Sequence, residues 1–311
     1  MEAAEYERQP DPQVSVVVAT HDGRDSLTTA VRSILHQSYE GSLECVVVFD
    51  QEAPYEIDAQ AGDGRSLRLL RNEGTEGAAG ARNYGVSMSR GAFVGFCDDD
   101  DEWLPNKTTK QVRALQVSSV EKVATCGIKV IHEGREFDKV PINDHVTAAD
   151  LLDSRSMGVH LSTLLMPREV FTTEVGPFDE AIPGSYGEDY DWLLRAVQLG
   201  SLRSVREPLV VVKWGSSRFS DRWATIIAGV TYLLEKHPEL QQGPRNVARM
   251  YGRLAFAHAA LGQRSSAWLW AGRALKSDRR QLRAYLALLV SIRIVPARIV
   301  VAVLNRFGKG I

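Results

Sequence analysis

Continuous apolar runs alternate with amphipathic segments through the first hundred residues of the chain. Val14–Ala19 reads VSVVVA and Cys45–Phe49 reads CVVVF, and shorter runs follow at Leu67–Leu70 and Ala92–Cys97. Runs rich in β-branched residues are typical of strands buried on both faces of a parallel sheet. Between the first two runs, apolar residues recur at helical spacing, at Leu27, Val31, Ile34 and Leu35. This rhythm predicts βαβ units and a doubly wound α/β sheet.

The pattern becomes less regular toward the middle of the chain and then turns helical. A glycine-rich loop, Gly74–Gly80, precedes a predicted helix at Ala81–Ser89. Further strands are predicted at Val123–Val130, Leu161–Met166 and Leu209–Lys213, with a helix at Tyr190–Leu199. From Asp221 onward the spacing is helical, including a hairpin of Val247–Leu261 and Ser265–Leu275. Pro296 is expected to kink a single long helix in the tail.

Composition narrows the class of protein. The 311 residues carry a formal charge of −2, so no global attraction to nucleic acid is expected. The polar, acidic N-terminus does not have the pattern of a signal peptide, and no apolar run reaches the length of a membrane span. The three cysteines lie in or beside apolar runs and lack metal-ligand spacing, which indicates buried, reduced thiols and a cytoplasmic protein.

Four consecutive aspartates follow the predicted strand at Ala92–Cys97, in the segment GAFVGFCDDDDEWLPNK. Adjacent carboxylates repel one another unless a positive charge lies among them, and Mg²⁺ and Mn²⁺ prefer such oxygen ligands. An acidic solvated turn is the alternative. The position of Asp98–Asp101 directly after a buried strand and before Trp103-Leu104-Pro105 favours a metal site.

Five motifs in this order resemble the family 2 glycosyltransferases, which have the GT-A fold. They are VSVVVATHDGR, ECVVVFDQ, NEGTEGAAGARNYGV, FCDDDDEWLPNK and VGPFDEAIPGSYGEDYDWLLRAVQLG. The resemblance implies a Rossmann-like mixed sheet flanked by helices, with an all-helical C-terminal region. It implies a hexosyltransferase that moves a sugar from a nucleotide diphosphate-sugar, UDP- or dTDP-linked, to a hydroxyl with inversion.

The same resemblance predicts a domain organisation. Residues 1–13 form a polar tail, and residues 14–220 form the catalytic domain. Within it, 14–101 bind the nucleotide-sugar and 102–220 bind the acceptor. Residues 221–311 form the helical C-terminal region.

Carried over by position, the motifs predict the donor site. The nucleotide-sugar contacts are Thr20, Asp22, Arg24, Asp50, Arg82, Asp98 and Asp99, and Asp100 is the ligand for Mn²⁺ or Mg²⁺. An aspartate at the position of Asp50 can accept the imide N–H of uracil or thymine. Arg82 can offset diphosphate charge, or it can pair with a neighbouring side chain on its helix.

The resemblance also predicts the acceptor side. An inverting transfer needs a carboxylate that takes the acceptor proton, and the motif assigns this to Asp189, with Glu188 orienting the acceptor or the loop. Alternatively, both acids stabilise the dipole of the helix that they open. Asp191 is expected to cap this helix or to pair with Arg195. Tyr186 and Trp192 are candidates to stack on the acceptor, and a core position is the alternative for Trp192.

Two positions depart from the family pattern. Phe49 stands where relatives often have a second acid, which leaves Asp50 alone at that strand end. Trp214 stands where many relatives have a histidine that completes the metal or diphosphate site. Lys213 or Arg218 can replace that contact.

The C-terminal tail and the choice of partner leave alternatives open. Basic residues outnumber acids from Lys276 to the end, between the apolar segments LALLVSIRIV and IVVAVL. Such helices fit peripheral contact with the inner face of a membrane, packing on the catalytic domain, or a homodimer. The expected acceptor is a lipid-linked, polysaccharide or other envelope glycoconjugate hydroxyl. A sugar nucleotidyltransferase and a non-catalytic nucleotide-sugar-binding relative remain as alternative functions.

Overall fold

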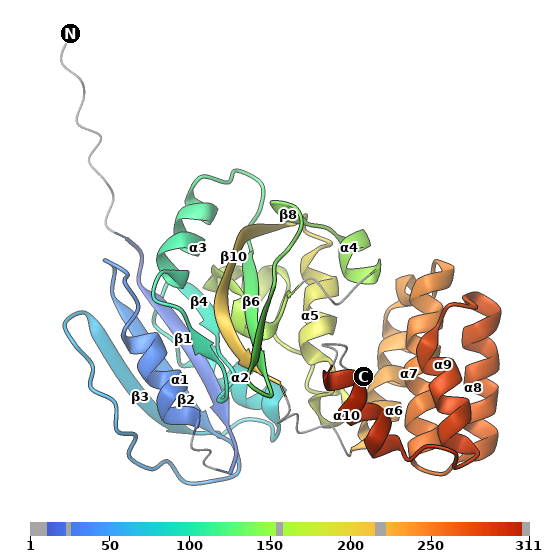
Figure 1. The fold of residues 1–311 in the computed structure, drawn as a ribbon. Coiled ribbons are helices and arrows are strands. Elements are labelled where there is room, and N and C mark those ends of the chain that lie inside the picture. The colour runs from blue at the N-terminus through green and yellow to red at the C-terminus, as the bar shows by residue number, and fades with distance from the viewer. Residues whose placement is uncertain (1–10, 23–25, 154–157, 215–221, 307–311) are drawn as a thin grey trace.

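In the computed structural model, a mixed β-sheet forms the centre of the N-terminal two thirds of the chain (Figure 1). The structure describes residues 11–22, 26–153, 158–214 and 222–306. The strands are β1 (Val14–Thr20), β2 (Leu43–Phe49), β3 (Arg65–Arg71), β4 (Phe93–Phe96), β5 (Glu102–Trp103), β6 (Ala124–His132), β7 (Arg135–Lys139), β8 (His145–Val146), β9 (Leu165–Pro167) and β10 (Leu202–Lys213).

The strand order places the expected functional segments side by side. The main path runs β3-β2-β1-β4-β9-β6-β10-β5, with β7 beside β6 and β8 beside β10. The strands β3, β2, β1 and β4 are mutually parallel, whereas β9 is antiparallel to both β4 and β6. The carboxyl ends of β1, β2 and β4 therefore meet at one edge, where α/β sheets bind their ligands.

Helices cover both faces of this sheet. On one face α1 (Ser26–Leu35) and α3 (Lys107–Gln116) bury their apolar sides against β1, β2, β6 and β10. On the other face α2 (Ala78–Ser87) and α5 (Glu188–Ala196) share a core with β1, β2 and β4. The predicted class, a GT-A-like α/β fold with a helical C-terminal region, is confirmed by this architecture.

Every described element after β10 is helical. These are α6 (Trp223–Lys236), a 3₁₀ turn at Pro238–Gln241, α7 (Pro244–Ala260), α8 (Arg264–Ser277), α9 (Leu282–Ser291) and α10 (Ala297–Arg306). A cluster of small residues lets α7, α8 and α9 approach closely, with Ala255, Ala271 and Ala287 fully buried between them. The segment expected to form one long helix kinked at Pro296 instead forms two helices, since α9 ends at Ser291 and α10 begins directly after Pro296. No helix in the described ranges combines the length and apolar character needed to cross a membrane.

Two local features complete the comparison with the sequence. The predicted strand Leu161–Met166 is wrong in its first half, since Leu161–Thr163 forms a 3₁₀ turn and only Leu165–Pro167 pairs in the sheet. The reason is local, because the side chains of His160 and Thr163 cap this turn reciprocally. Cys45, Cys97 and Cys126 are buried and free, as predicted. The remaining described helix is α4 (Ala148–Asp153), together with short turns at Val170–Glu174 and Pro183–Ser185.

A buried ionic network fixes α5 to the start of the helical region. The carboxylate of Asp191, which is fully buried, lies 2.7 Å from Lys236 Nζ and 2.8 Å from His237 Nε2. Arg195 pairs with the same carboxylate one turn along α5, which confirms the predicted pair. Burial alone would raise the pKa of Asp191, but these partners outweigh it and hold the pKa at about 2. The first turn of α5 is thus bound to the C-terminal end of α6.

Candidate active site

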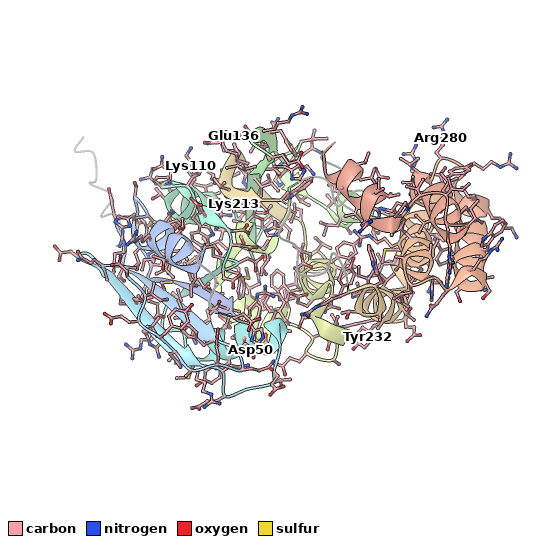
Figure 2. The ribbon with its side chains drawn as sticks, turned by 60° about the horizontal axis from the view of Figure 1, so that its bottom comes forward. Asp50, Lys110, Glu136, Lys213, Tyr232 and Arg280 are labelled. Carbon is pink, nitrogen blue, oxygen red and sulfur yellow. The ribbon has the colours of Figure 1, made fainter. Side chains whose placement is uncertain are left out.

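The ends of β1, β2 and β4 are joined by direct hydrogen bonds. The backbone N–H of Asp50 donates to the carbonyl oxygen of Thr20 at 2.8 Å. The hydroxyl of Thr20 donates to Oδ2 of Asp99, also at 2.8 Å, and all three residues are buried. Figure 2 is turned so that this end of the parallel strands comes forward, with Asp50 labelled. These contacts place the turn after β1 against the acidic run after β4.

The carboxylate of Asp50 holds the glycine-rich loop. Its Oδ1 accepts from Asn72 Nδ2 at 2.9 Å, and its Oδ2 accepts from the N–H of Gly77 at 2.9 Å and from Gln51 Nε2 at 3.2 Å. Gly77 adopts a φ of 104° at the start of α2, a backbone conformation that favours glycine. A carboxylate has about four acceptor positions, and the donors in the described part of the chain occupy three of those on Asp50, which leaves one for a further donor.

Arg82 connects the two acidic motifs, which lie far apart in sequence. Its guanidinium contacts Oδ1 of Asp98 at 2.7 Å and Oε1 of Glu188 at 2.5 Å. The side chain of Arg82 is only 9% exposed and lies over the ring of Phe178. Burial alone would lower the pKa of Arg82, but the charges of Asp98 and Glu188 outweigh it and raise the pKa. Arg82 therefore ties the start of α5 to the acidic run.

Three side chains of the acidic run and its neighbourhood could hold a metal ion. Ligand atoms of Asp98, Asp101 and His160 all lie within 4.8 Å of one another. Burial raises the pKa of Asp101 to about 7, although the neighbouring His160 lowers it. Ser162 donates to Oδ2 of Asp101 at 2.6 Å, so this carboxylate is held in place. Two carboxylates with an imidazole fit a divalent cation, and the nitrogen ligand favours Mn²⁺ over the harder Mg²⁺.

The acidic pair Glu188 and Asp189 opens α5, as expected for helix N-terminal acids. Glu188 is buried against Arg82, and burial raises the pKa of Glu188 to about 7, against the lowering effect of Arg82. Asp189 is partly exposed, and its Oδ1 accepts from the N–H of Tyr190 at 2.7 Å. The two acids therefore differ in access: Glu188 faces inward to the guanidinium, and Asp189 is accessible from solvent.

The structure corrects one predicted acceptor contact. Trp192 is fully buried, donates from Nε1 to the carbonyl oxygen of Gly176 at 3.0 Å, and stacks on Phe171. Its ring has no face available to a sugar, so Trp192 is a core residue and the acceptor prediction for it is wrong. Tyr186, by contrast, is partly exposed just before α5.

The other predicted positions fall into three groups. Asp22 is exposed after β1 with a φ of 69°. Lys213 pairs with Glu102 at 2.6 Å, and Trp214 packs edge-on against Phe137. Arg24 and Arg218 lie outside the described residues.

The sequence pattern gave no indication of His160, and it included Asp101 in the acidic run without singling it out as a metal ligand. The histidines lack the regular spacing that marks many metal sites, and His160 follows the acidic run by some sixty residues. Asp100, the predicted ligand, is partly exposed and stands outside the three-residue group. The available signal was the spacing of His160 and Thr163, whose side chains cap a tight turn reciprocally and so fix the direction of the imidazole.

Comparisons with known proteins agree with this geometry. A family model described as Glycosyl transferase family 2 matches residues 15–172. The chain is 27% identical over 229 residues to the amylovoran biosynthesis glycosyltransferase AmsB of Erwinia amylovora, covering 66% of this chain and 72% of the relative. It is 24% identical over 213 residues to the UDP-Glc:alpha-D-GlcNAc-diphosphoundecaprenol beta-1,3-glucosyltransferase WfgD of Escherichia coli, covering 68% and 79%.

Solved structures share the fold at low sequence identity. S. aureus TarS in complex with UDP-GlcNAc superposes with a TM-score of 0.57 at 17% identity, over 96% of this chain and 92% of that chain. The mannosyltransferase PcManGT from Pyrobaculum calidifontis, in complex with GDP-Man and Mn²⁺, gives 0.50 at 16% identity, over 97% and 83%. Because the family model covers just over half of the 311 residues, this protein belongs to glycosyl transferase family 2 and is a glycosyltransferase with a GT-A-like fold.

Proposed function

We propose that this glycosyltransferase moves a sugar from a uridine or thymidine diphosphate-sugar to a hydroxyl acceptor with inversion. The observation that carries the proposal is the Asp98–Arg82–Glu188 bridge, which brings the acidic run and the Glu188–Asp189 pair to one edge of the sheet. We assign donor binding to residues 14–101, acceptor binding to 102–220, and a supporting role to the helices of 221–311.

The nucleobase of the donor is assigned from the hydrogen-bond acceptor position that remains on Asp50. Uracil and thymine offer an imide N–H to a carboxylate. Among the described residues, Gln51, Asn72 and Gly77 donate to Asp50, which leaves one acceptor position on this carboxylate. Asp22 and Arg24 follow β1 directly in the sequence, and we assign them to the nucleotide as well. WfgD uses a UDP-sugar by its name, and TarS has been solved with UDP-GlcNAc, which supports the same choice.

A divalent cation, Mn²⁺ or Mg²⁺, is assigned to the acidic run. Asp98, Asp101 and His160 would hold it, together with Asp100 as the motif predicts. A cation held there would supply positive charge that stabilises the departing diphosphate. Asp99 is fixed by the Thr20 hydroxyl and is assigned to the donor ribose.

Asp189 is assigned as the general base. Its carboxylate accepts the acceptor proton while the acceptor oxygen bonds to the anomeric carbon and the bond from that carbon to the diphosphate oxygen breaks. Attack opposite the leaving group inverts the anomeric centre. Glu188 is bound by Arg82 and instead positions the first turn of α5.

Calorimetric titration of UDP, dTDP and GDP, with Mn²⁺ and with EDTA, tests the donor site. We expect one uridine or thymidine diphosphate to bind with Mn²⁺ and to lose at least about tenfold in affinity with EDTA, because the cation carries charge-assisted contacts. Asp100→Ala and His160→Ala should each cause a similar loss, whereas Asp63→Asn, an exposed control, should not.

The donor titration has two outcomes against the proposal. If none of the three nucleotides binds in the presence of Mn²⁺, the donor assignment is wrong. If binding is unaffected by EDTA and by both substitutions, the metal assignment is wrong while a metal-independent donor site remains.

The helices α8–α10 are assigned to peripheral contact with an anionic membrane surface. Residues 262–311 contain ten basic residues and one acid, whereas the rest of the chain contains 27 basic and 38 acidic residues. Large apolar side chains are exposed on the same helices and on the connection between α9 and α10, namely Trp268, Leu269, Leu282, Tyr285, Leu289, Ile292, Ile294, Ile299 and Val303. Cations beside exposed apolar groups fit an anionic lipid interface. AmsB and WfgD act, by their names, in amylovoran biosynthesis and on a diphosphoundecaprenol-linked sugar, which supports an acceptor in envelope polysaccharide or glycolipid synthesis.

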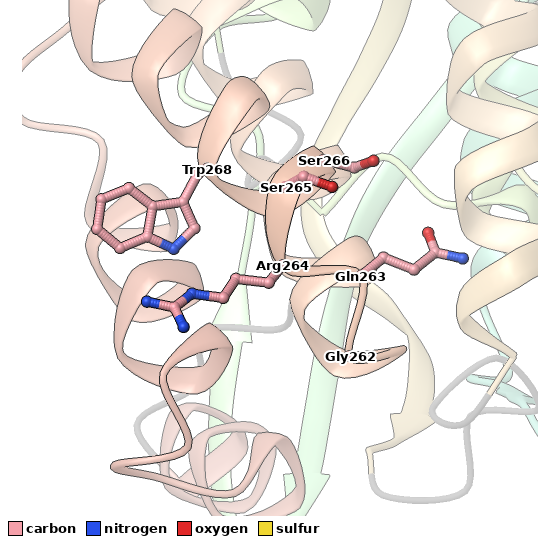
Figure 3. Close-up of a pocket in the computed structure, with 6 residues that line it drawn as sticks. All are labelled: Gly262, Gln263, Arg264, Ser265, Ser266 and Trp268. Carbon is pink, nitrogen blue, oxygen red and sulfur yellow. The ribbon is translucent and has the colours of Figure 1, made fainter.

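The beginning of α8 shows how such a surface is built. An open depression is lined by Gly262–Ser266 and Trp268, and Figure 3 shows Arg264 extending beneath the indole of Trp268. The guanidinium lies 5.8 Å from the ring centroid. Trp268 Nε1 donates to Ser291 at the end of α9, so the ring is held across two helices. Arg280 lies at the outer end of the helical region (Figure 2).

Co-sedimentation with vesicles tests the membrane assignment. We expect binding to vesicles of phosphatidylglycerol and phosphatidylcholine but not of phosphatidylcholine alone. Replacing Arg293 and Arg298 with glutamine should weaken binding by about 2 kcal/mol, or roughly thirtyfold, at about 1 kcal/mol per basic residue. Ile142→Ser, an exposed apolar control outside these helices, should bind like wild type. Equal binding to both vesicle types, or a stable dimer that binds neither, would argue against a lipid surface.

A further inference from the structure

Three arginines meet where α7 and α9 pack together beside the acceptor side of the site. Arg249 and Arg253 lie one turn apart on the same face of α7. Arg283 of α9 lies next to them, because α7 and α9 are in close contact at Gly252. A Cβ at Gly252 would lie 3.1 Å from Gln281 and 3.4 Å from Cβ of Arg283. The helix pair thus gathers three guanidinium groups in one place.

This arginine cluster, Arg249, Arg253 and Arg283, borders the residues that flank the Glu188–Asp189 pair. Nη2 of Arg249 donates to the hydroxyl oxygen of Tyr190 at 3.0 Å, and its guanidinium lies 6.0 Å from the centroid of that ring. Arg283 interacts electrostatically with Tyr186. The cluster of the C-terminal helices therefore contacts the side chain of Tyr190, which follows the proposed base Asp189 in the first turn of α5.

The electrostatics of the arginine cluster favour an anion. Burial, and then the charges of Arg253 and Arg249, lower the pKa of Arg283, which still stays protonated at neutral pH. Nε of Arg253 is buried and has no hydrogen-bond acceptor among the described residues. Partly buried like charges repel one another, and a buried donor without an acceptor is destabilising. A bound oxyanion would relieve both costs.

We propose that Arg249, Arg253 and Arg283, with the hydroxyl of Tyr186, bind the phosphate or diphosphate group of the acceptor. This inference rests on the proposed function, because it takes the Tyr186 side of α5 as the acceptor side. Arginine pairs with phosphate oxygens through two parallel N–H bonds, and three such groups match the charge of a diphosphate. The site selects acceptors by an anionic group near the hydroxyl that is glycosylated.

Two kinds of acceptor carry this chemistry, a lipid-linked diphosphate and a soluble phosphate ester, and direct binding separates them. The probes are farnesyl diphosphate, glycerol 3-phosphate and inorganic pyrophosphate, with farnesol as the uncharged match. All are titrated in EDTA, so that metal-dependent binding at the acidic run is removed. Tighter binding of farnesyl diphosphate than of pyrophosphate indicates a lipid-linked acceptor. Equal binding of the two, or preference for glycerol 3-phosphate, indicates a soluble phosphate. Farnesol should not bind.

Substitutions locate the anion. Arg253→Gln and Arg283→Gln should each weaken pyrophosphate binding by about tenfold or more, the usual value of a charge-assisted hydrogen bond, and the double substitution should abolish it. Arg113→Gln, an exposed control on α3, should leave the affinity unchanged. Wild-type affinity in the double variant, or an equal loss in Arg113→Gln, would overturn the proposal.

Thermal denaturation separates anion binding from a structural role of the arginine cluster. Without ligand, the unfolding temperature of Arg283→Gln reports the structural contribution of Arg283, because the substitution removes both its repulsion from Arg253 and Arg249 and its other contacts. With pyrophosphate, only the wild type should be stabilised. If Arg283→Gln is strongly destabilised without ligand and pyrophosphate still raises its unfolding temperature as much as that of the wild type, the arginine is structural and the proposal is wrong. Binding of UDP with Mn²⁺, measured on the same samples, reports the donor site separately: if UDP does not bind wild type, the proposed function fails instead.

Discussion

Replacing Asp189 with asparagine is expected to lower kcat by about 10²–10⁴-fold while leaving the affinity for the donor unchanged. Asparagine has the same shape, but its amide cannot take a proton from the acceptor hydroxyl. Asp189 is partly exposed at the first turn of α5, whereas Glu188 is bound to Arg82, so only Asp189 is accessible as a base. The measurement is steady-state sugar transfer, with UDP affinity determined by calorimetry.

Two controls make the Asp189 result specific. Asp63→Asn, an exposed acid outside the site, should retain wild-type transfer. Transfer by Asp189→Asn within about threefold of wild type would contradict the role of general base. A parallel loss of donor affinity would instead assign Asp189 to the donor site.

Replacing Arg82 with methionine is expected to lower the free energy of unfolding by about 3–5 kcal/mol, because two carboxylates lose their buried cation. Asp98 and Glu188 would then face each other without the guanidinium that contacts both. Transfer should fall as well, since the turn that carries Asp189 is no longer tied to the acidic run. Urea denaturation at fixed pH measures the change in stability.

The double variant Arg82→Met/Glu188→Gln distinguishes charge from packing. It should recover part of the lost stability, because one uncompensated carboxylate is removed. Arg113→Met, at an exposed position, should change stability by less than about 0.5 kcal/mol. A wild-type unfolding free energy for Arg82→Met would show that the bridge does not hold the two motifs. A double variant no more stable than the single one would place the loss in packing against Phe178.

The pattern of the sequence was sufficient for the elements that form the donor half. β1, β2 and β4 were each predicted within about three residues at either end, because buried parallel strands are continuous apolar runs with polar ends. Asp50 and Asp98–Asp101 were identified for the same reason, since they follow those strands directly. Local spacing also predicted the Asp191–Arg195 pair, whereas at Pro296 it predicted a kink where the structure has two separate helices.

Contacts between distant segments could not be obtained in this way. Arg82 was left open between diphosphate binding and a helix-surface pair, and the structure instead shows it buried between Asp98 and Glu188. The position of Trp192 along its helix fits either an exposed aromatic residue or a core residue. Only its burial and its packing against Phe171 show that it belongs to the core. His160 has no nearby partner in sequence that would mark it.

The sequence by itself determined the family, the order of the strands along the chain and the acids at their carboxyl ends, because these follow from short-range periodicity and motif order. The tertiary structure alone decided which charges meet. Arg82 reaches Glu188 across 106 residues, His160 reaches Asp101, and the arginine cluster reaches Tyr190 from a separate helical region. The physical reason is that burial and charge pairing depend on which surfaces pack together, and local sequence does not encode that choice for a single side chain.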